Sequence, residues 1–371
     1  MVLRATISPA SLCKSAAREL SFGMTTSSDS APNPFQLDRE DIGGLHAYLV
    51  ERGFAQDGET VTAELAGEGN MNCVVRVRLP NRNLILKQAR PWVEKYPSIA
   101  APVERAASEA RFYRFAARNP LVAAMMPRLL DFDDKSALLV MEDLFAAEPL
   151  IDCYEGSRRF NQRQLKELAK YTSALHSLAV PVNEREGFRN TAMRRLNHEH
   201  IFDLPLRRDG VLSEMLERIT PGLDHVADDL RQDSKYCDTV RSLGERYLRQ
   251  NGPSLIHGDL FPGSLLQTGS GELRIIDPEF CFCGDPEFDI GVFYAHLLLS
   301  EHGEDAVSWW LQVALENKKH SDSLVFQYAG VEIMRRILGV AQLPVRLSLE
   351  AKRRLLEQSR AMVLRGVKAT A

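Results

Sequence analysis

The chain has 371 residues, of which 26% are charged, and a formal net charge of −4. Because a single hydrophobic core stops growing near ~250–300 residues, this length predicts two modest domains or one large domain. The charge balance gives no general attraction to nucleic acid or to an anionic membrane, and the apolar stretch at residues 291–300 is far shorter than the ~18 residues of a membrane span. We therefore predict a soluble, cytoplasmic protein whose partners include neither nucleic acid nor a membrane.

The N-terminal segment, residues 1–37, is predicted to lie outside the fold because it lacks the apolar periodicity needed for packing. Its first 23 residues contain scattered basic residues and serines with a single acidic residue. That composition is typical of an organelle transit peptide. Met24 offers an alternative start, so organelle targeting and an upstream mis-start both stay open beside the cytoplasmic prediction.

The next part of the chain predicts a small lobe built on antiparallel strands. Residues 38–53 have apolar side chains at helical spacing, with Asp38 as the candidate cap. Residues 63–80 and 83–89 predict two strands of a hairpin that turns at Pro80-Asn81, and its first strand begins at a Gly-rich turn. A helix from Pro102 to Arg118 and a strand over residues 136–143 complete the predicted N-terminal lobe, residues 38–143.

After Leu144 the pattern changes to long helices, which continue to Leu248. A strand-like segment, LIHGDL, and a hairpin around Gly269-Ser270-Gly271 interrupt them before a helical remainder. This change predicts a larger, mainly helical C-terminal lobe, residues 144–371. The expected fold class is therefore α+β, with a small antiparallel sheet in one lobe and helices in the other.

Two short motifs in the second lobe supply carboxylates in the order that phosphoryl transfer requires. Asp259 in HGDLFPGS is the candidate catalytic base, and Ser264 occupies the position where protein kinases have the Asn that helps to bind magnesium. Asp277 and Glu279 in IDPEF follow an apolar run at strand spacing, and their oxygens suit Mg²⁺. Each carboxylate alone is equally compatible with a turn or cap residue, and the ordered pair favours the catalytic interpretation.

The first lobe supplies candidates for binding nucleotide phosphates. Lys87 lies on a strand of Leu and Ile, where a charge is costly without a partner. Glu109 on the following helix is the predicted partner, with Glu104 as the competitor, and an exposed Lys87 on an edge strand is the alternative. The Gly-rich turn, whose backbone would approach the phosphates, provides the remaining candidates: Gly67, Gly69 and Asn70.

Two polar residues beside the motifs are predicted to have structural roles. Asp289 precedes an apolar helical run, where we expect it to cap the helix and to brace the catalytic loop. His257 is expected to brace the same loop through hydrogen bonds rather than to act as an acid or base.

Taken together, these motifs resemble the aminoglycoside phosphotransferase and choline kinase-like branch of the protein kinase-like fold, and within it the 5-methylthioribose kinases. The closer resemblance rests on seven segments in matching order from about residue 38 to 350: GEGNMNCVVRV, LILKQARP, LVMEDL, HGDLFPGS, IDPEF, FDIGVFYAHLLL and RRILGVA. It implies a bilobal kinase-like fold with ATP between the lobes, Asp259 as base, and Asp277 with Glu279 on magnesium.

The resemblance also assigns roles that the residues alone would not suggest. It implies that the adenine contacts the hinge backbone, which is formed by Met141, Glu142, Asp143 and Leu144. Arg335 and Arg336 match paired arginines that approach the acceptor and the transferring phosphate in this family, where a guanidinium would stabilise transition-state charge. From the sequence alone, an arginine pair on a helix would be interpreted as a solvated face.

The loop beside the candidate base departs from the family pattern. Methylthioribose kinases typically have HGDLHTGS, whereas this chain has Phe261 and Pro262 in place of His-Thr. The leading prediction is a Mg²⁺-ATP-dependent kinase of a small sugar hydroxyl, producing 5-methylthioribose 1-phosphate from 5-methylthioribose. The alternatives are an amino alcohol, homoserine or aminoglycoside acceptor, or a degenerate kinase fold that binds nucleotide. The sequence leaves open whether the protein forms a homodimer.

Overall fold

The computed structural model describes residues 34–67, 71–249, 251–316 and 320–368. The chain divides into two compact units. Of the described residues, unit 1 contains those up to Ala110 together with Arg128–Asp143, and unit 2 contains Arg111–Pro127 and those from Leu144 onward. The sequence placed Arg111–Pro127 in the N-terminal lobe, but this segment packs within unit 2, where the rings of Phe115 and Phe188 are 5.3 Å apart.

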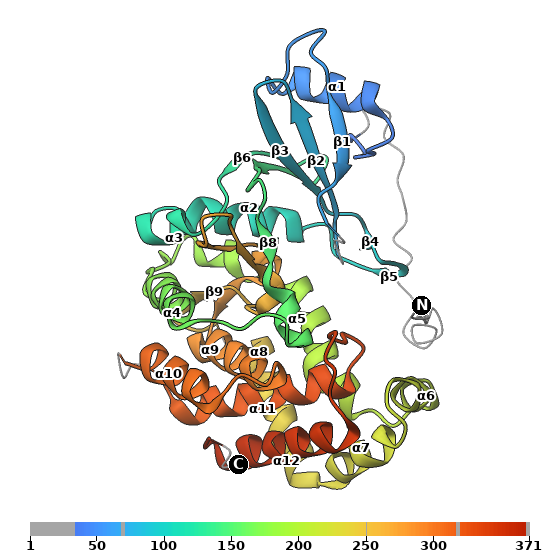
Figure 1. The fold of residues 1–371 in the computed structure, drawn as a ribbon, viewed down its shortest axis with the longest axis vertical. Helices are drawn as coiled ribbons and strands as arrows, with labels where there is room; N and C mark the ends of the chain where they lie inside the picture. Colours follow the sequence, from blue (N-terminus) through green and yellow to red (C-terminus); the bar gives the residue numbers. More distant parts are fainter. Residues whose placement is uncertain (1–33, 68–70, 250, 317–319, 369–371) are drawn as a thin grey trace. The chain divides into compact units, whose positions relative to one another are not determined.

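Unit 1 is built on a five-stranded antiparallel sheet with the strand order β1-β2-β3-β7-β6 (Figure 1). Its elements are α1 (Ile42–Glu51), β1 (Thr62–Leu65), β2 (Cys73–Leu79), β3 (Arg82–Gln88), β4 (Trp92–Val93), β5 (Tyr96–Ala100), β6 (Leu129–Asp133), β7 (Leu138–Glu142) and the first residues of α2 (Arg105–Ala116). The predicted hairpin at Pro80-Asn81 is confirmed, because Leu79 pairs with Arg82 directly across the turn.

The core of unit 1 lies between α1 and the sheet. Strand β2 alternates buried and half-buried residues, as expected for a strand with one face on a core. Its buried valines, Val75 and Val77, join Leu45 and Leu49 of α1 in one apolar cluster.

Two predictions for the chain before α1 are wrong. Residues 1–37 were expected to lie outside the fold, but Leu37 is fully buried in the same cluster, and its amide donates to Gln88 at 2.8 Å. The predicted cap was Asp38, but Asp41 caps α1 by accepting from the Gly44 amide, while Asp38 accepts from the Glu40 amide in the preceding turn.

Unit 2 is mainly helical, and short strands connect its helices. Its helices are α3 (Pro120–Ala124), α4 (Gln162–His176), α5 (Thr191–His198), α6 (Gly210–Ile219), α7 (Leu223–Gln232), α8 (Ser234–Arg249), α9 (Pro286–Leu299), α10 (Glu304–Ala314), α11 (Asp322–Leu338) and α12 (Leu349–Arg365). Its strands are β8 (Glu148–Pro149), β9 (Ser254–Ile256), β10 (Leu265–Gln267), β11 (Leu273–Ile275) and β12 (Phe282–Gly284). Short 3₁₀ or π segments are η2 (Leu150–Glu155), η3 (Arg185–Phe188), η4 (Glu199–Asp203), η5 (Leu204–Leu206), η6 (Pro262–Ser264) and η7 (Pro278–Phe280).

Helix α11 packs against both α9 and α12 in the centre of unit 2 (Figure 1). Nearly every residue of α9 is buried, so this helix is apolar around most of its circumference. Two glycines allow the close packing. A Cβ at Gly291 of α9 would lie 2.4 Å from the Val325 carbonyl oxygen, and one at Gly330 of α11 would lie 2.7 Å from that of Ser359. This packing fixes α11, which carries the arginine pair.

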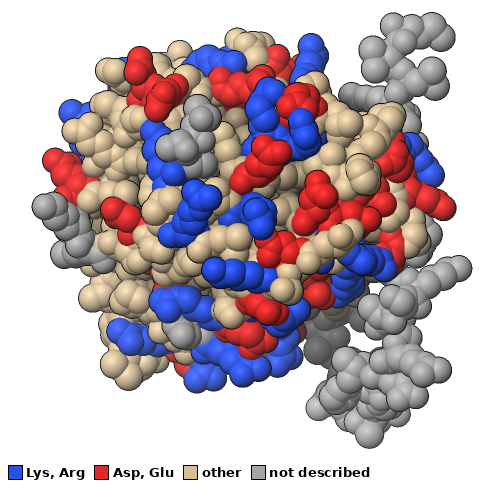
Figure 2. All heavy atoms as spheres, turned by 90° about the horizontal axis from the view of Figure 1, so that it is seen from below, with Lys and Arg blue, Asp and Glu red and all other residues tan. Residues whose placement is uncertain are grey.

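Both signs of charge occur on the face of the molecule that Figure 2 shows. Lysine and arginine side chains are intermixed there with aspartate and glutamate. Exposed helices pair such charges locally, as in Arg163 with Glu167 at 2.8 Å, and pairs of this kind contribute about 0–1 kcal/mol each. Among the described residues, no helix combines the length and the apolar character that crossing a membrane would require.

Candidate active site

The HGD motif lies directly after strand β9, where the chain makes a turn that requires glycine. Gly258 has a φ of +84°, and a Cβ at this position would lie 2.2 Å from the carbonyl oxygen of Phe280. Any other residue would be strained by its backbone conformation and would also clash with the neighbouring chain. The glycine therefore allows the chain to turn sharply between His257 and Asp259.

A buried carboxylate on α9 holds this turn in place. Asp289 is fully buried and accepts hydrogen bonds from the backbone amides of His257 (2.8 Å) and Gly258 (3.0 Å) and from Nε2 of His176 (2.9 Å). Burial alone would raise the pKa of Asp289, but the His176 contact and the backbone donors outweigh it, so the pKa is lowered. The predicted bracing role is confirmed, whereas the predicted capping role is wrong because Asp285 occupies the N-cap of α9.

Further hydrogen bonds join the two sequence motifs. His257 contacts the Ile276 carbonyl through Nε2 at 2.9 Å, and burial lowers the pKa of this imidazole. The Ile276 amide donates to the Ser264 carbonyl, and the Ser264 hydroxyl donates to the Asp259 carbonyl at 2.9 Å. HGDLFPGS and IDPEF are therefore joined by hydrogen bonds into one substructure of unit 2, and the Ser264 hydroxyl takes part in it. Ser264 as a magnesium ligand stays a prediction.

The two carboxylates of IDPEF are placed by a turn and not by a strand, which corrects the predicted strand spacing. Strand β11 ends at Ile275, Asp277 adopts a left-handed conformation (φ +63°), and Glu279 lies in η7. Asn190 fixes the turn by donating to the carbonyls of Glu279 and Cys281. The donor set fits Mg²⁺, which takes one or two carboxylates together with phosphates and water. The described residues contain no group of three or more His, Cys, Asp or Glu side chains that could hold a metal ion. A magnesium ion at Asp277 and Glu279 would therefore also need phosphate or water ligands.

Arg335 and Arg336 converge on Asp259 from the last turn of α11. Arg336 Nη2 donates to Asp259 Oδ1 at 3.2 Å, and Arg335 Nη1 lies 3.6 Å from the same oxygen. Both arginines are buried, whereas the Asp259 side chain keeps 17% of its surface exposed. The arginine pair is thus not the solvated face that the sequence alone would suggest. Its role toward an acceptor or a phosphate stays a prediction.

Sequence reasoning missed three residues behind the arginines. Glu332 accepts from Arg335 Nη1 (3.0 Å) and from Arg336 Nε (2.6 Å), and it also contacts His296. His296 in turn contacts Tyr154. A signal for Glu332 was present, because a glutamate three and four positions before two arginines shares a helix face with them. No local pattern indicated Tyr154, which lies more than a hundred positions away in the chain.

In unit 1 the structure brings Lys87 and Glu109 together. Lys87 Nζ lies 2.8 Å from Glu109 Oε1 and 2.7 Å from Oε2, and both side chains are buried. The competitor Glu104 is exposed. Gly67 follows β1, and Gly69 and Asn70 lie outside the described residues. Their roles toward a nucleotide stay predictions.

A buried arginine that the sequence did not single out fixes the chain after the Gly-rich turn. Arg105 donates to the Asn72 side chain at 2.9 Å and to the Met71 carbonyl at 2.9 Å, and it also donates to the Arg90 and Pro102 carbonyls. A charged group without exposure is tolerated only when its donors are satisfied in this way. Arg105 therefore anchors the start of β2 to the start of α2.

The predicted hinge residues have diverse surroundings. Met141 and Glu142 end strand β7, and Glu142 accepts from the Arg128 amide at 3.1 Å. The Asp143 side chain is buried and pairs with Arg76 Nε at 3.0 Å, which indicates a structural role for that carboxylate. Leu144 begins the continuous part of unit 2. A contact between this backbone and adenine stays a prediction.

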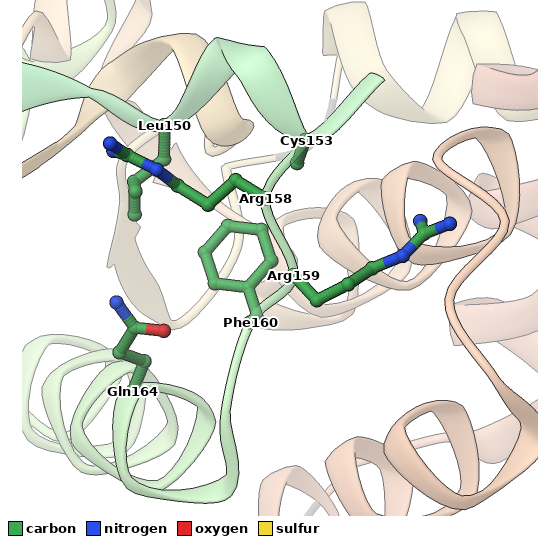
Figure 3. A pocket seen from close by; sticks show the side chains of 6 residues that line it. All are labelled: Leu150, Cys153, Arg158, Arg159, Phe160 and Gln164. Atoms are coloured by element: carbon green, nitrogen blue, oxygen red, sulfur yellow. The ribbon is translucent and has the colours of Figure 1, made fainter. Parts of the chain in front are cut away.

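A small hollow of unit 2 contains none of the predicted site residues. It is lined by Leu150, Cys153, Arg158, Arg159, Phe160 and Gln164 (Figure 3). Its space of about 140 Å³ is smaller than the ~300–1,000 Å³ of typical ligand sites. Burial raises the pKa of the Cys153 thiol to about 12, so this group is no nucleophile. The hollow is therefore not a candidate for the acceptor site.

We expect stability to fall as the pH drops from about 6.5 to 4. Burial lowers the pKa of His296 and that of His302 to about 4, whereas an unfolded histidine titrates near 6.5. Between these pH values the unfolded chain binds more protons than the folded chain, so acid favours unfolding. Each pH unit below the unfolded pKa costs about 1.4 kcal/mol for one such histidine. The fully buried His296 therefore accounts for a loss of about 3 kcal/mol down to pH 4. Denaturant unfolding at pH 7.5, 6, 5 and 4 measures this loss.

A pair of variants assigns part of that pH dependence. His302 Nε2 accepts from the Phe160 amide at 2.9 Å, so protonating the ring would break this bond. His302→Gln should reduce the slope of stability against pH, while His225→Gln, at an exposed position, should leave the slope unchanged. An equal slope in both variants would contradict the assignment to His302.

Comparison with known proteins gives consistent matches over most of the chain. Residues 62–311 match the model of the phosphotransferase enzyme family. Methylthioribose kinase of Exiguobacterium sibiricum is 28% identical over 333 residues, covering 76% of this chain and 81% of the relative, and that of Bacillus mycoides is 27% identical over 341 residues, covering 79% and 83%. The crystal structure of spectinomycin phosphotransferase with ADP and spectinomycin covers 87% of this chain and 98% of its own, with 12% identity and a TM-score of 0.54. This structural likeness confirms the predicted fold class.

Proposed function

The chain belongs to the phosphotransferase enzyme family, and we propose that this small-molecule phosphotransferase transfers the γ-phosphoryl group of ATP to a hydroxyl group of a small sugar with Mg²⁺ as its cofactor. The observation that carries the proposal is the convergence of two buried arginines on Asp259. A partly exposed carboxylate beside buried cations can receive a proton from an acceptor while the cations stabilise negative charge on a phosphoryl group.

Asp259 acts as the base in this proposal. The two arginine contacts are both made to Oδ1. We therefore assign Oδ2 to the acceptor hydroxyl. Oδ2 takes the hydroxyl proton as the acceptor oxygen attacks the γ-phosphorus, and the bond from that phosphorus to the bridging oxygen breaks to release ADP. Arg335 and Arg336 stabilise the charge that develops on the transferred group. The braced turn at Gly258 keeps the carboxylate in position throughout.

The remaining groups serve the nucleotide. Lys87, fixed by Glu109, binds phosphate oxygens, the glycines and Asn70 of the Gly-rich turn approach them through the backbone, and the hinge segment Met141 to Leu144 contacts adenine. Asp277 and Glu279, with Ser264, are the residues that would hold Mg²⁺, which when bound supplies charge neutralisation at the phosphates. We accordingly propose residues 38–143 as the ATP-binding lobe and residues 144–371 as the catalytic and substrate-binding lobe, with Arg111–Pro127 folding with the latter.

The acceptor that we propose is 5-methylthioribose, phosphorylated at its anomeric hydroxyl. Two observations support this choice over an amino alcohol or an aminoglycoside. The curated relatives named above are methylthioribose kinases, matched over about four fifths of their length. The catalytic loop also has Ser264 where the aminoglycoside and choline-type kinases have Asn.

The test measures ADP release by the purified protein with Mg²⁺-ATP and one acceptor at a time. We expect 5-methylthioribose to stimulate the rate at least about tenfold over ribose, choline, homoserine and kanamycin, because one well-placed apolar group contributes about 1–3 kcal/mol of discrimination. EDTA should abolish the stimulation. Stimulation by another acceptor would reject the proposed substrate, and stimulation by none would reject the small-sugar kinase itself.

A further inference from the structure

We propose that Tyr154, His296 and Glu332 form a buried hydrogen-bond relay that positions the arginine pair on Asp259. Tyr154 Oη lies 2.6 Å from His296 Nδ1, and His296 Nε2 lies 3.0 Å from Glu332 Oε1. Glu332 then holds Arg335 through Oε2 and Arg336 through Oε1. The inference rests on the proposed function, because it gives these residues a role in orienting the phosphate-binding arginines.

The direction of the hydrogen bonds in this relay follows from the charges. Burial would raise the pKa of Glu332, but Arg335 and Arg336 outweigh burial and lower it, so the carboxylate accepts. His296 must then donate through Nε2, and its Nδ1 must accept from the Tyr154 hydroxyl. Burial keeps the tyrosine protonated, because it raises the pKa of Tyr154. Each of the two hydrogen bonds that join Tyr154, His296 and Glu332 therefore has an assigned direction.

The relay determines the charge that faces a substrate. Glu332 compensates only one of the two guanidinium charges, and neutral His296 and Tyr154 add none. The second positive charge is directed at Asp259 and at any phosphate that approaches it. A buried arginine and glutamate group tolerates little distortion, because each charge loses its hydration and depends on its partners. A shift of Glu332 would thus move both arginines.

Phe261 encloses the relay from the catalytic loop. The Arg336 guanidinium carbon lies 4.8 Å from the centroid of the Phe261 ring, and the rings of Phe261 and His296 are 5.5 Å apart. A Cβ at Gly263 would lie 2.4 Å from the same ring, so this glycine leaves room for it. Phe261, which departs from the family loop, therefore packs on Arg336 and His296. Its presence in place of the family's histidine is compatible with an unchanged acceptor.

Tyr154→Phe tests the relay with the smallest chemical change. We expect kcat to fall about tenfold with the KM for ATP unchanged, because the ring stays in place while His296 loses the donor that fixes its tautomer. The matched control is Tyr236→Phe, which removes another buried hydroxyl, hydrogen-bonded to Ser359 at 2.9 Å and remote from the arginines in its contacts. Both variants should lose similar stability, and only Tyr154→Phe should lose turnover. Equal kcat in the two variants would overturn the proposal.

Two further measurements separate this inference from the proposed function. Phe261→Leu should lower kcat while preserving the order of acceptor preference. A changed order would show that Phe261 lines the acceptor site instead.

The second measurement is the protonation of the His296 ring. In ¹⁵N-histidine spectra, His296 should carry its proton on Nε2 in the wild type and lose this fixed pattern in Tyr154→Phe. If the protein phosphorylates no acceptor but His296 carries its proton on Nε2, only the proposed function is refuted. Absence of the pattern in the wild type refutes the relay.

Discussion

Replacing Asp259 with asparagine is expected to lower kcat by about three orders of magnitude while ATP still binds. An amide cannot take the proton of the acceptor hydroxyl, and a positioned general base contributes about 10²–10⁴-fold. The amide oxygen can still accept from Arg336, so the side chain keeps its place. Initial rates with saturating acceptor give kcat, and calorimetric titration with a nonhydrolysable ATP analogue gives the affinity for nucleotide.

The control for this variant is Asp238→Asn, which makes the same chemical change at an exposed ion pair with Arg241 on α8. It should leave both kcat and nucleotide affinity as in the wild type. If Asp259→Asn retained more than about a tenth of the wild-type kcat, Asp259 would not be the base, and the arginines alone would have to account for catalysis. A parallel loss of nucleotide binding would instead indicate misfolding.

The features that could be predicted from the sequence are those with a local cause. A lysine between Leu and Ile on a strand needs a buried partner, and the glutamate on the next helix is that partner, at 2.7–2.8 Å. Likewise, the carboxylate of Asp289 near the start of an apolar helix was expected to brace the catalytic loop, and it does so. In both cases burial of a charge among apolar residues is costly, so the sequence itself indicates that a contact must exist.

The features that could not be predicted depend on long-range packing. Tyr154 reaches His296 across 142 positions, and neither residue has a neighbour in sequence that requires the contact. Asp277 was expected at strand spacing, but its left-handed backbone is imposed by the turn into η7, and such a conformation is rare for a residue other than glycine. The continuous helical pattern of α2 also concealed that its second half groups with unit 2.

Replacing Asp289 with asparagine is expected to lower the free energy of unfolding by about 2 kcal/mol and also to reduce kcat. The buried carboxylate receives three donors: His257 and His176 bind Oδ2, and the Gly258 amide binds Oδ1. An amide has a single acceptor oxygen, which can keep the two bonds made to Oδ2, but its NH₂ group then faces the Gly258 amide. Leaving that buried donor unsatisfied costs about 1–3 kcal/mol. The turn that carries Asp259 would then lose its anchor at Gly258.

This outcome differs in kind from that of Asp259→Asn, although the two aspartates belong to the same loop network. The control is Asp322→Asn, because Asp322 lies exposed in the first turn of α11. This change removes only the interaction of the charge with the helix dipole, which contributes about 0.3–1 kcal/mol. Denaturant unfolding should therefore give a lower free energy of unfolding for Asp289→Asn than for Asp259→Asn and Asp322→Asn. If Asp289→Asn unfolded like Asp322→Asn, the three hydrogen bonds would not hold the loop, and the orientation of Asp259 would have to come from the arginine pair alone.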